Sequence, residues 1–185
     1  SLWLPEPISY FFIAGLSFYI LCIVLGLSPW VGILGGLAYA FSTYNPIIVS
    51  VGHNTKMMSI AYAPVVIAGV LMLFDKKYIL GLLITAFFSG VLIGQNHLQI
   101  VYYLMIIIGA LSIGFLIKSI KEKLLSRGII AIALAALGGF IGLGLNASMI
   151  MPTYDYAKET MRGGVSQLTL SDADKASNKS KGGLD

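Results

Sequence analysis

Residues 98–117 read LQIVYYLMIIIGALSIGFLI and carry no charged side chain, and residues 118–127 then read KSIKEKLLSR. An apolar run of about 20 residues has the length that an α-helix needs to cross a bilayer. A basic loop directly after such a run is typical of the membrane surface. This stretch therefore predicts a transmembrane helix, and it gives the pattern to look for in the rest of the chain.

The composition extends this interpretation to most of the 185 residues. The chain is 57% hydrophobic and only 11% charged, whereas about 25% of the residues in a soluble domain are charged. We therefore expect an all-α fold, a polytopic transmembrane helical bundle in the lipid bilayer. The net charge of +4 is modest and gives no reason to expect a nucleic-acid partner.

Further apolar segments occur along the chain, separated by short polar or basic breaks. Together with residues 98–117 they predict about six spans within residues 1–150: 8–27, 31–51, 57–74, 78–94, 98–117 and 128–150. Neighbouring spans should be antiparallel, because irregular backbone cannot face lipid and the links are short. The second span is the weakest, since it contains several glycines and Pro46, and a re-entrant hairpin formed by the second and third spans is the alternative.

Within the spans, small residues are read as packing positions. The strings GGLAYAF (35–41) and GGFIGLGLN (138–146) contain close glycines, which let transmembrane helices approach one another. The single cysteine, Cys22, lies inside an apolar run and is interpreted as a small hydrophobic residue facing lipid or another helix.

The segment after residue 150 is more polar. Residues 151–162 have the spacing of a short amphipathic helix, with Pro152 near its start, where a missing N–H costs nothing. Residues 163–185 are rich in Gly, Ser, Lys and Asp and are expected to form a flexible linker that is truncated here. We expect the sequence to be a piece of a longer protein.

The distribution of charge predicts an orientation. With six spans, one side of the membrane receives six basic residues: Lys76, Lys77, Lys118, Lys121, Lys123 and Arg127. The other side receives only Lys56, Lys158 and Arg162 close to the membrane. The positive-inside rule then makes the first side cytoplasmic, and both ends of the chain extracytoplasmic.

Two polar clusters, GHNTKM (52–57) and GQNHLQ (94–99), share the predicted outer side with the segment after residue 150. Lys and Arg bind phosphate well, so we expect a substrate or phosphate site from these positions: His53, Asn54, Lys56, Gln95, Asn96, His97, Lys158 and Arg162. Asp155, Tyr156 and Glu159 are candidates for acid–base chemistry or acceptor contact. Helix capping, loop solvation and a charged helix face in water are the simpler explanations, and they stay open.

Signals for metal or cofactor binding are weak in this sequence. Neither histidine belongs to an HxxxH or HxH pair, so we assign no metal ligand and no cofactor, and a divalent cation stays open. The P-loop, Rossmann and GxSxG patterns do not occur in the sequence.

Three stretches carry a resemblance to a known family: GGLAYAFSTYNPIIVSVGHNTKMMSIAYAPVVIAGV (35–70), GQNHLQIVYYL (94–104) and NASMIMPTYDYAKETMRGG (146–164). They resemble the YfhO-like bacterial integral membrane proteins, in the form common among Bacteroidetes. The resemblance implies the GT-C architecture of membrane glycosyltransferases. It further implies transfer of a sugar from a polyprenyl-phosphate-linked donor to an extracytoplasmic glycan or polymer of the cell envelope.

The same resemblance implies that the catalytic aspartate lies in an outer loop before Ser1, so the catalytic residue is unknown within this chain. Two other functions stay open on the residues alone. One is a transporter or flippase for a lipid-linked or anionic solute, which would need ionisable residues and broken helices near the bilayer midplane. The other is a non-catalytic membrane scaffold.

Overall fold

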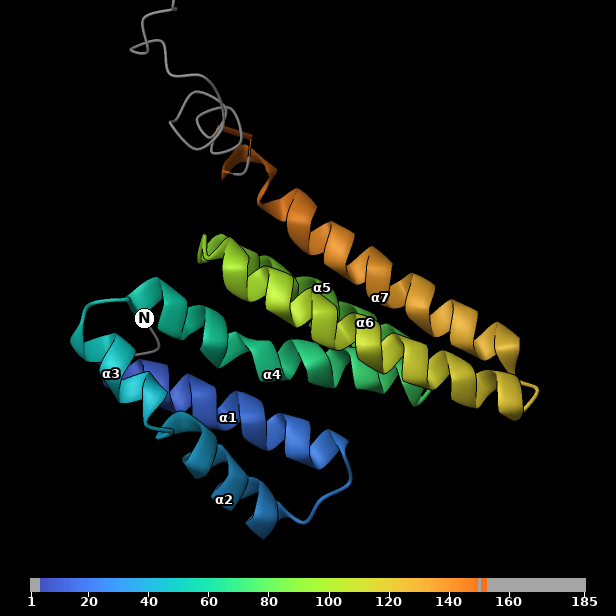
Figure 1. Ribbon diagram of the computed structural model, residues 1–185, viewed down its shortest axis with the longest axis horizontal. Coiled ribbons are helices and arrows are strands. Elements are labelled where there is room, and N and C mark those ends of the chain that lie inside the picture. Colours follow the sequence, from blue (N-terminus) through green and yellow to red (C-terminus); the bar gives the residue numbers. More distant parts are fainter. Residues whose placement is uncertain (1–3, 150, 153–185) are drawn as a thin grey trace, which may run out of the picture. The chain divides into compact units, whose positions relative to one another are not determined.

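The computed structural model describes residues 4–149 and 151–152, which are helical apart from turns and contain no β-strand. The helices are α1 (Ile8–Val24), α2 (Pro29–Ala40), α3 (Tyr44–Ser50), α4 (Asn54–Phe74), α5 (Tyr78–Gly94), α6 (Leu98–Lys121) and α7 (Leu125–Leu145) (Figure 1). They belong to one compact unit, Ser1–Asn146. A second unit, Ala147–Asp185, is described only over 147–149 and 151–152, which are helical. The expected helical bundle is thus confirmed for the described residues.

Three of the described helices, α4, α6 and α7, are long and apolar enough to cross a membrane. The apolar helices α1 and α5 have 17 residues each, which corresponds to about 26 Å, slightly less than the roughly 30 Å of a hydrocarbon core. Helix α2 has 12 residues and extends about 18 Å. The chain therefore has the character of a membrane protein, and the number of spans stays a prediction.

The second expected span, 31–51, is not one helix. It is divided into α2 and α3, with a break between Ala40 and Tyr44. Pro46 explains the position of the break, because in a continuous helix its ring would clash with the carbonyl of Ser42 and one hydrogen bond would be missing. At the third position of α3, the same proline has no helical hydrogen bond to lose.

Two side chains, the buried Asn45 and the half-buried Tyr39, stabilise this break and connect it to α4. Asn45 is 2% exposed, and its Nδ2 donates to the carbonyl oxygens of Tyr39, at 2.8 Å, and Ala40, at 3.1 Å. The Tyr39 hydroxyl donates to the carbonyl oxygen of Ile60 at 2.8 Å. That carbonyl lacks its usual helical partner, because Pro64 lies four residues later in α4 and has no N–H. The broken segment therefore satisfies a backbone group that the proline leaves open.

Glycines bring pairs of helices into close contact. A Cβ added to Gly36 of α2 would lie 2.6 Å from the carbonyl oxygen of Gly15 in α1. A Cβ added to Gly142 of α7 would lie 2.7 Å from the backbone nitrogen of Gly90 in α5. Helix packing is thus confirmed for Gly35 and Gly36 of the string 35–41 and for Gly138 and Gly142 of the string 138–146, but not for Gly139 and Gly144, where an added Cβ would meet no atom within 4 Å. Cys22 is buried.

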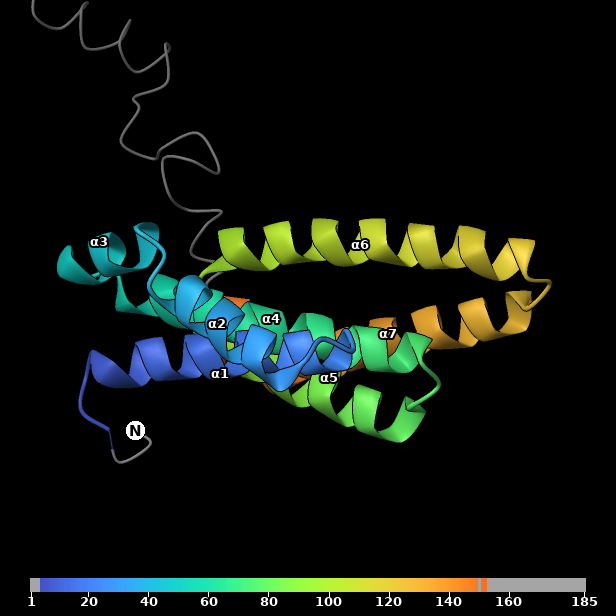
Figure 2. The ribbon, with the colours of Figure 1, turned by 90° about the horizontal axis from the view of Figure 1, so that it is seen from below.

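Successive long helices of this unit run in alternating directions. In both views, α3, the start of α4, the end of α5, the start of α6 and the end of α7 lie at one end (Figures 1 and 2). The α4–α5 and α6–α7 turns lie at the opposite end. The turns at 51–53 and 95–97 thus share one end, as the alternation of the spans predicts. We call the residues His53, Asn54, Lys56, Gln95, Asn96, His97 and Gln99 at this end the polar rim.

Candidate functional site

The two histidines of the polar rim lie on turns of the same design. In each turn a residue with positive φ, Gly52 at 82° or Asn96 at 55°, precedes the histidine that begins the next helix. Glycine and asparagine adopt this conformation more readily than other residues. Neither His53 nor His97 caps its helix through the side chain. Both imidazoles are therefore available for other contacts.

Lys56 is held at the rim by an aromatic ring. Its ammonium lies 5.1 Å from the centroid of the Tyr44 ring, which is within the range of a cation–π contact. Lys56 is half-buried, whereas His53 and Asn54 next to it are exposed. The aliphatic stem of the lysine can thus lie along the protein while its charge stays at the membrane surface.

The amides of the second cluster have local partners. The Nε2 of Gln95 donates to the carbonyl oxygen of Val91 at 3.3 Å, and that of Gln99 donates to the Tyr103 hydroxyl at 2.8 Å. Each of these bonds leaves the amide oxygen able to accept another hydrogen bond. The capping and solvation explanation fits these two residues in part, because each bond lies within one helix or at its end.

His97 differs from its neighbours. Its Nδ1 atom is buried and has no hydrogen-bond partner among residues 4–149 and 151–152. Most buried polar atoms in folded proteins are hydrogen-bonded, so an exception calls for a water, an ion or a ligand group as the missing partner. This is the strongest local sign of a binding function in the described part of the rim.

The sequence did not single out Asn146, which belongs to the same end of the bundle. Its Nδ2 donates to the carbonyl oxygens of Gly90, at 2.8 Å, and Gly142, at 2.9 Å. It therefore fastens the end of α7 to α5 where the two glycine-rich faces meet. An asparagine directly after a glycine-rich span was the available signal. Asn45 and Tyr39 were missed in the same way, because their partners come from other helices or from the turn between them.

The structure brings the two clusters to the same end but not into direct contact. Among the described residues, no hydrogen bond or ion pair joins the His53–Lys56 group to the Gln95–Gln99 group. The five remaining predicted site residues lie outside the described residues: Asp155, Tyr156, Lys158, Glu159 and Arg162. Beyond Met151 and Pro152, the expected amphipathic segment and the linker lie outside them too. Their part in the site stays a prediction.

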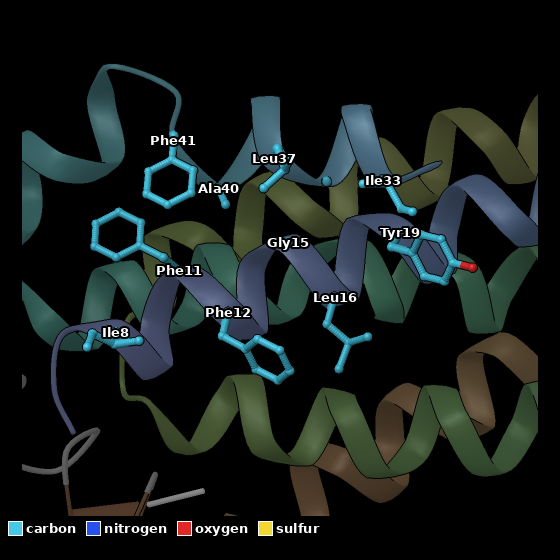
Figure 3. A pocket seen from close by; sticks show the side chains of 11 residues that line it. Ile8, Phe11, Phe12, Gly15, Leu16, Tyr19, Ile33, Leu37, Ala40 and Phe41 are labelled. Atoms are coloured by element: carbon cyan, nitrogen blue, oxygen red, sulfur yellow. The ribbon is translucent and has the colours of Figure 1, made fainter. Parts of the chain in front are cut away.

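The described residues contain no group of three or more His, Cys, Asp or Glu side chains that could hold a metal ion. An apolar groove of about 460 Å³ lies between α1 and α2 (Figure 3). Its wall includes the stacked rings of Phe11 and Phe41, whose centroids are 5.2 Å apart. The polar-rim residues do not line this groove, so it is separate from the candidate site.

Comparison with protein-family models, with curated proteins and with solved structures finds no match for this chain.

Proposed function

We propose that this chain is part of a membrane-embedded glycosyltransferase of the GT-C type in a bacterial inner membrane. The enzyme transfers a sugar from a polyprenyl-phosphate-linked donor to an extracytoplasmic acceptor, a glycan or polymer of the cell envelope. The observation that carries the proposal is the unpartnered, buried Nδ1 of His97 within a polar rim at one end of an apolar bundle. The YfhO-like resemblance supplies the reaction class.

Each group at the rim has a chemical role in this proposal. Lys56, placed by the ring of Tyr44, contacts the phosphate of the donor, since an ammonium is a strong phosphate partner. The Nδ1 atom of His97 forms a hydrogen bond with an oxygen of the sugar donor. Lys158 and Arg162 add positive charge, and Asp155, Tyr156 and Glu159 contact the acceptor.

The orientation is part of the proposal. The end opposite the rim carries Lys76, Lys77, Lys118, Lys121, Lys123 and Arg127. By the positive-inside rule this end is cytoplasmic and the rim faces outward, where a lipid-linked donor meets an envelope acceptor. A reporter enzyme inserted after Lys77 should be active inside the cell, and activity outside would reverse the orientation.

Two observations weigh against a transporter. The described helices carry Asp, Glu, Lys, Arg and His side chains only near their ends, such as Lys56 and Arg127. A discontinuous helix often supplies open carbonyls to an ion in transporters, but Asn45 already binds two carbonyls at the break between α2 and α3. The described helices therefore lack the interior charged side chains and open carbonyls that a solute pathway would need, and their polar groups lie near the helix ends.

The test uses membranes that contain the whole protein to which this chain belongs. We expect Lys56→Ala and His97→Ala to lower kcat/KM for sugar transfer roughly ten- to a hundredfold, as the loss of a charge-assisted hydrogen bond worth about 1.5–3 kcal/mol implies. Tyr44→Leu should raise KM by freeing Lys56, whereas Tyr44→Phe keeps the ring and should be close to wild type. Lys77→Ala, at the basic end, is the matched control.

Insertion and amount of each variant are measured beside the activity. Sugar transfer unchanged in Lys56→Ala, His97→Ala and Arg162→Ala would remove these residues from the site. Equal losses in the rim variants and in Lys77→Ala would point to damaged folding and not to lost substrate contact.

A further inference from the structure

A cavity of about 360 Å³ lies among α4, α5, α6 and α7. Most of its wall is aliphatic, and the residues that bound it include Val66, Leu92, Val101, Leu104, Ile108 and Leu143. The polar side chains that line it are the hydroxyl residues Thr85, Ser89 and Ser112, and no lining residue is charged. This cavity lies inside the part of the chain with membrane character.

The cavity is elongated and begins next to the polar rim. Val101 lies in the first turn of α6, and Leu143 lies two residues before the end of α7. Along α6 the lining continues to Ser112, a distance of about 16 Å at 1.5 Å per residue. Half of a hydrocarbon core about 30 Å thick is about 15 Å. The cavity is therefore as deep as one leaflet of a bilayer.

A further protein segment is a poor occupant of this space, and water suits only part of it. The hydroxyls of Thr85, Ser89 and Ser112 can bind water, and Thr85 Oγ1 is buried without a hydrogen-bond partner in the described part of the chain. The aliphatic remainder of the wall offers no polar partner to a water molecule. An α-helix about 10 Å across and as long as the cavity would fill roughly 1,200 Å³, far more than the 360 Å³ present. A single hydrocarbon chain is thin enough, apolar and abundant in a membrane.

Two glycines keep the cavity open. Gly109 of α6 and Gly139 of α7 line it, and a Cβ added to either would meet no atom within 4 Å. At Gly90 and Gly142, in contrast, an added Cβ would come within 3.2 Å and 2.7 Å of atoms of the facing helix. Helix contact thus explains the second pair but not the first.

We propose that this cavity holds one acyl chain of a membrane phospholipid, whose head group lies at the polar rim. The chain enters beside Val101 and Leu143 and extends inward toward Ser112. The site fills the space that α6 leaves against the other helices. It does not depend on the proposed sugar transfer, because chain binding needs neither donor nor acceptor.

The test is photolabelling in vesicles of phosphatidylethanolamine and phosphatidylglycerol, with a trace of phosphatidylglycerol that carries a diazirine in its acyl chain. After irradiation, mass spectrometry maps the labelled residues. We expect the cavity residues Leu104 and Ile108 to be labelled more strongly than Ile106 and Ile113, which are exposed on the same helix.

A pair of matched double variants tests whether the space itself is required. Gly109→Leu with Gly139→Leu fills the cavity and should lower labelling of Leu104 and Ile108 roughly tenfold, equivalent to about 1.4 kcal/mol. Gly114→Leu with Gly144→Leu changes glycines of the same two helices that also have open space but do not line the cavity, and it should leave labelling unchanged.

Three results would overturn the proposal. Equal labelling of cavity and exposed residues would mean ordinary contact with surrounding lipid, and unchanged labelling in Gly109→Leu with Gly139→Leu would mean that the space is not required. Loss of phospholipid labelling on adding a trace of polyprenyl phosphate would assign the cavity to that lipid instead. The photolabelling test does not measure sugar transfer. A negative labelling result therefore leaves the proposed glycosyltransferase function untouched, and a negative sugar-transfer result leaves the lipid site untouched.

Discussion

Helices α4 and α6 are both apolar and long enough to cross a membrane, yet they are packed very differently. Of the most apolar part of α4, 61% is buried against the rest of the chain, whereas only 6% of the corresponding part of α6 is buried. Figure 2 shows α6 lying to one side of α4, α5 and α7. The buried face of α4 includes small residues such as Ser59, Ala61 and Gly69. The exposed face of α6 carries large ones such as Met105 and Ile113.

This difference shows what hydropathy can and cannot predict. An apolar run of sufficient length predicts that a helix enters the membrane, but lipid is as apolar as leucine, so hydrophobicity alone does not draw helices together. Close packing through small residues does, because it lets backbones approach. Both helices contain small residues, but those of α4, such as Ala61 and Gly69, are buried against other helices, whereas a Cβ added to Gly109 or Gly114 of α6 would meet no atom within 4 Å. The contacts of the small residues, and not their presence, therefore distinguish the helix in the middle of this bundle from the helix at its side.

The largest effect should come from enlarging a glycine on α4. A Cβ at Gly69 would lie 2.6 Å from Thr85 Oγ1 and 2.9 Å from the Thr85 backbone nitrogen in α5. We expect Gly69→Leu to lower the free energy of unfolding by about 3 kcal/mol or more, since overpacking against backbone forces helices apart. Unfolding by SDS titration, followed by circular dichroism, measures the change.

The matched control is Gly114→Leu on α6, where an added Cβ meets no atom within 4 Å. It should change the free energy of unfolding by no more than about 0.5 kcal/mol. Similar losses of unfolding free energy in the two variants would show that α4 and α6 are equally packed, which would contradict the difference described here.

The next largest effect concerns the broken segment beside α4. Asn45→Ala removes the amide that binds the carbonyl oxygens of Tyr39 and Ala40. The carbonyl of the buried Ala40 then loses this partner, whereas that of Tyr39 keeps the backbone N–H of Ser42 at 3.4 Å. We expect a loss of about 2 kcal/mol in the free energy of unfolding. Asn54→Ala, at an exposed position at the start of α4, should have almost no effect in the same titration. A small effect at Asn45 would mean that water reaches the break.

A third variant tests how α4 tolerates its proline. Tyr39→Phe removes the hydroxyl that donates to the carbonyl of Ile60, and it should cost about 1 kcal/mol. In a Pro64→Ala background the new N–H at position 64 can bind that carbonyl, so the same change should cost less than half as much. A double-mutant cycle measures the coupling. Equal costs in the two backgrounds would show that the hydroxyl of Tyr39 does not compensate for the N–H that Pro64 lacks.

The sequence predicted the features that depend on neighbouring residues. The helical class, the turns near residues 75–77 and 95–97 and the shared end of the two histidine turns follow from apolar length and alternation. The break in span 31–51 was not predicted. A proline is tolerated in the first turn of a helix and disrupts a helix in its interior, and the sequence does not show which of the two applies to Pro46. The contacts of Lys56, Asn45 and Asn146 depend on the approach of other helices or turns, which local pattern does not contain.

The smallest effect is expected on the exposed face of α6. Ile113 is 62% exposed, so Ile113→Ala removes apolar atoms that the bundle does not bury. Because those atoms face the same apolar surroundings whether or not α6 is docked, the free energy of unfolding should change by less than about 0.5 kcal/mol. Leu73→Ala on α4, where the side chain is fully buried, should cost about 2–5 kcal/mol and shows that the titration can detect a loss. A large cost at Ile113 would mean that another part of the protein covers this face of α6. The difference in burial between α4 and α6 would then hold only for contacts within this chain.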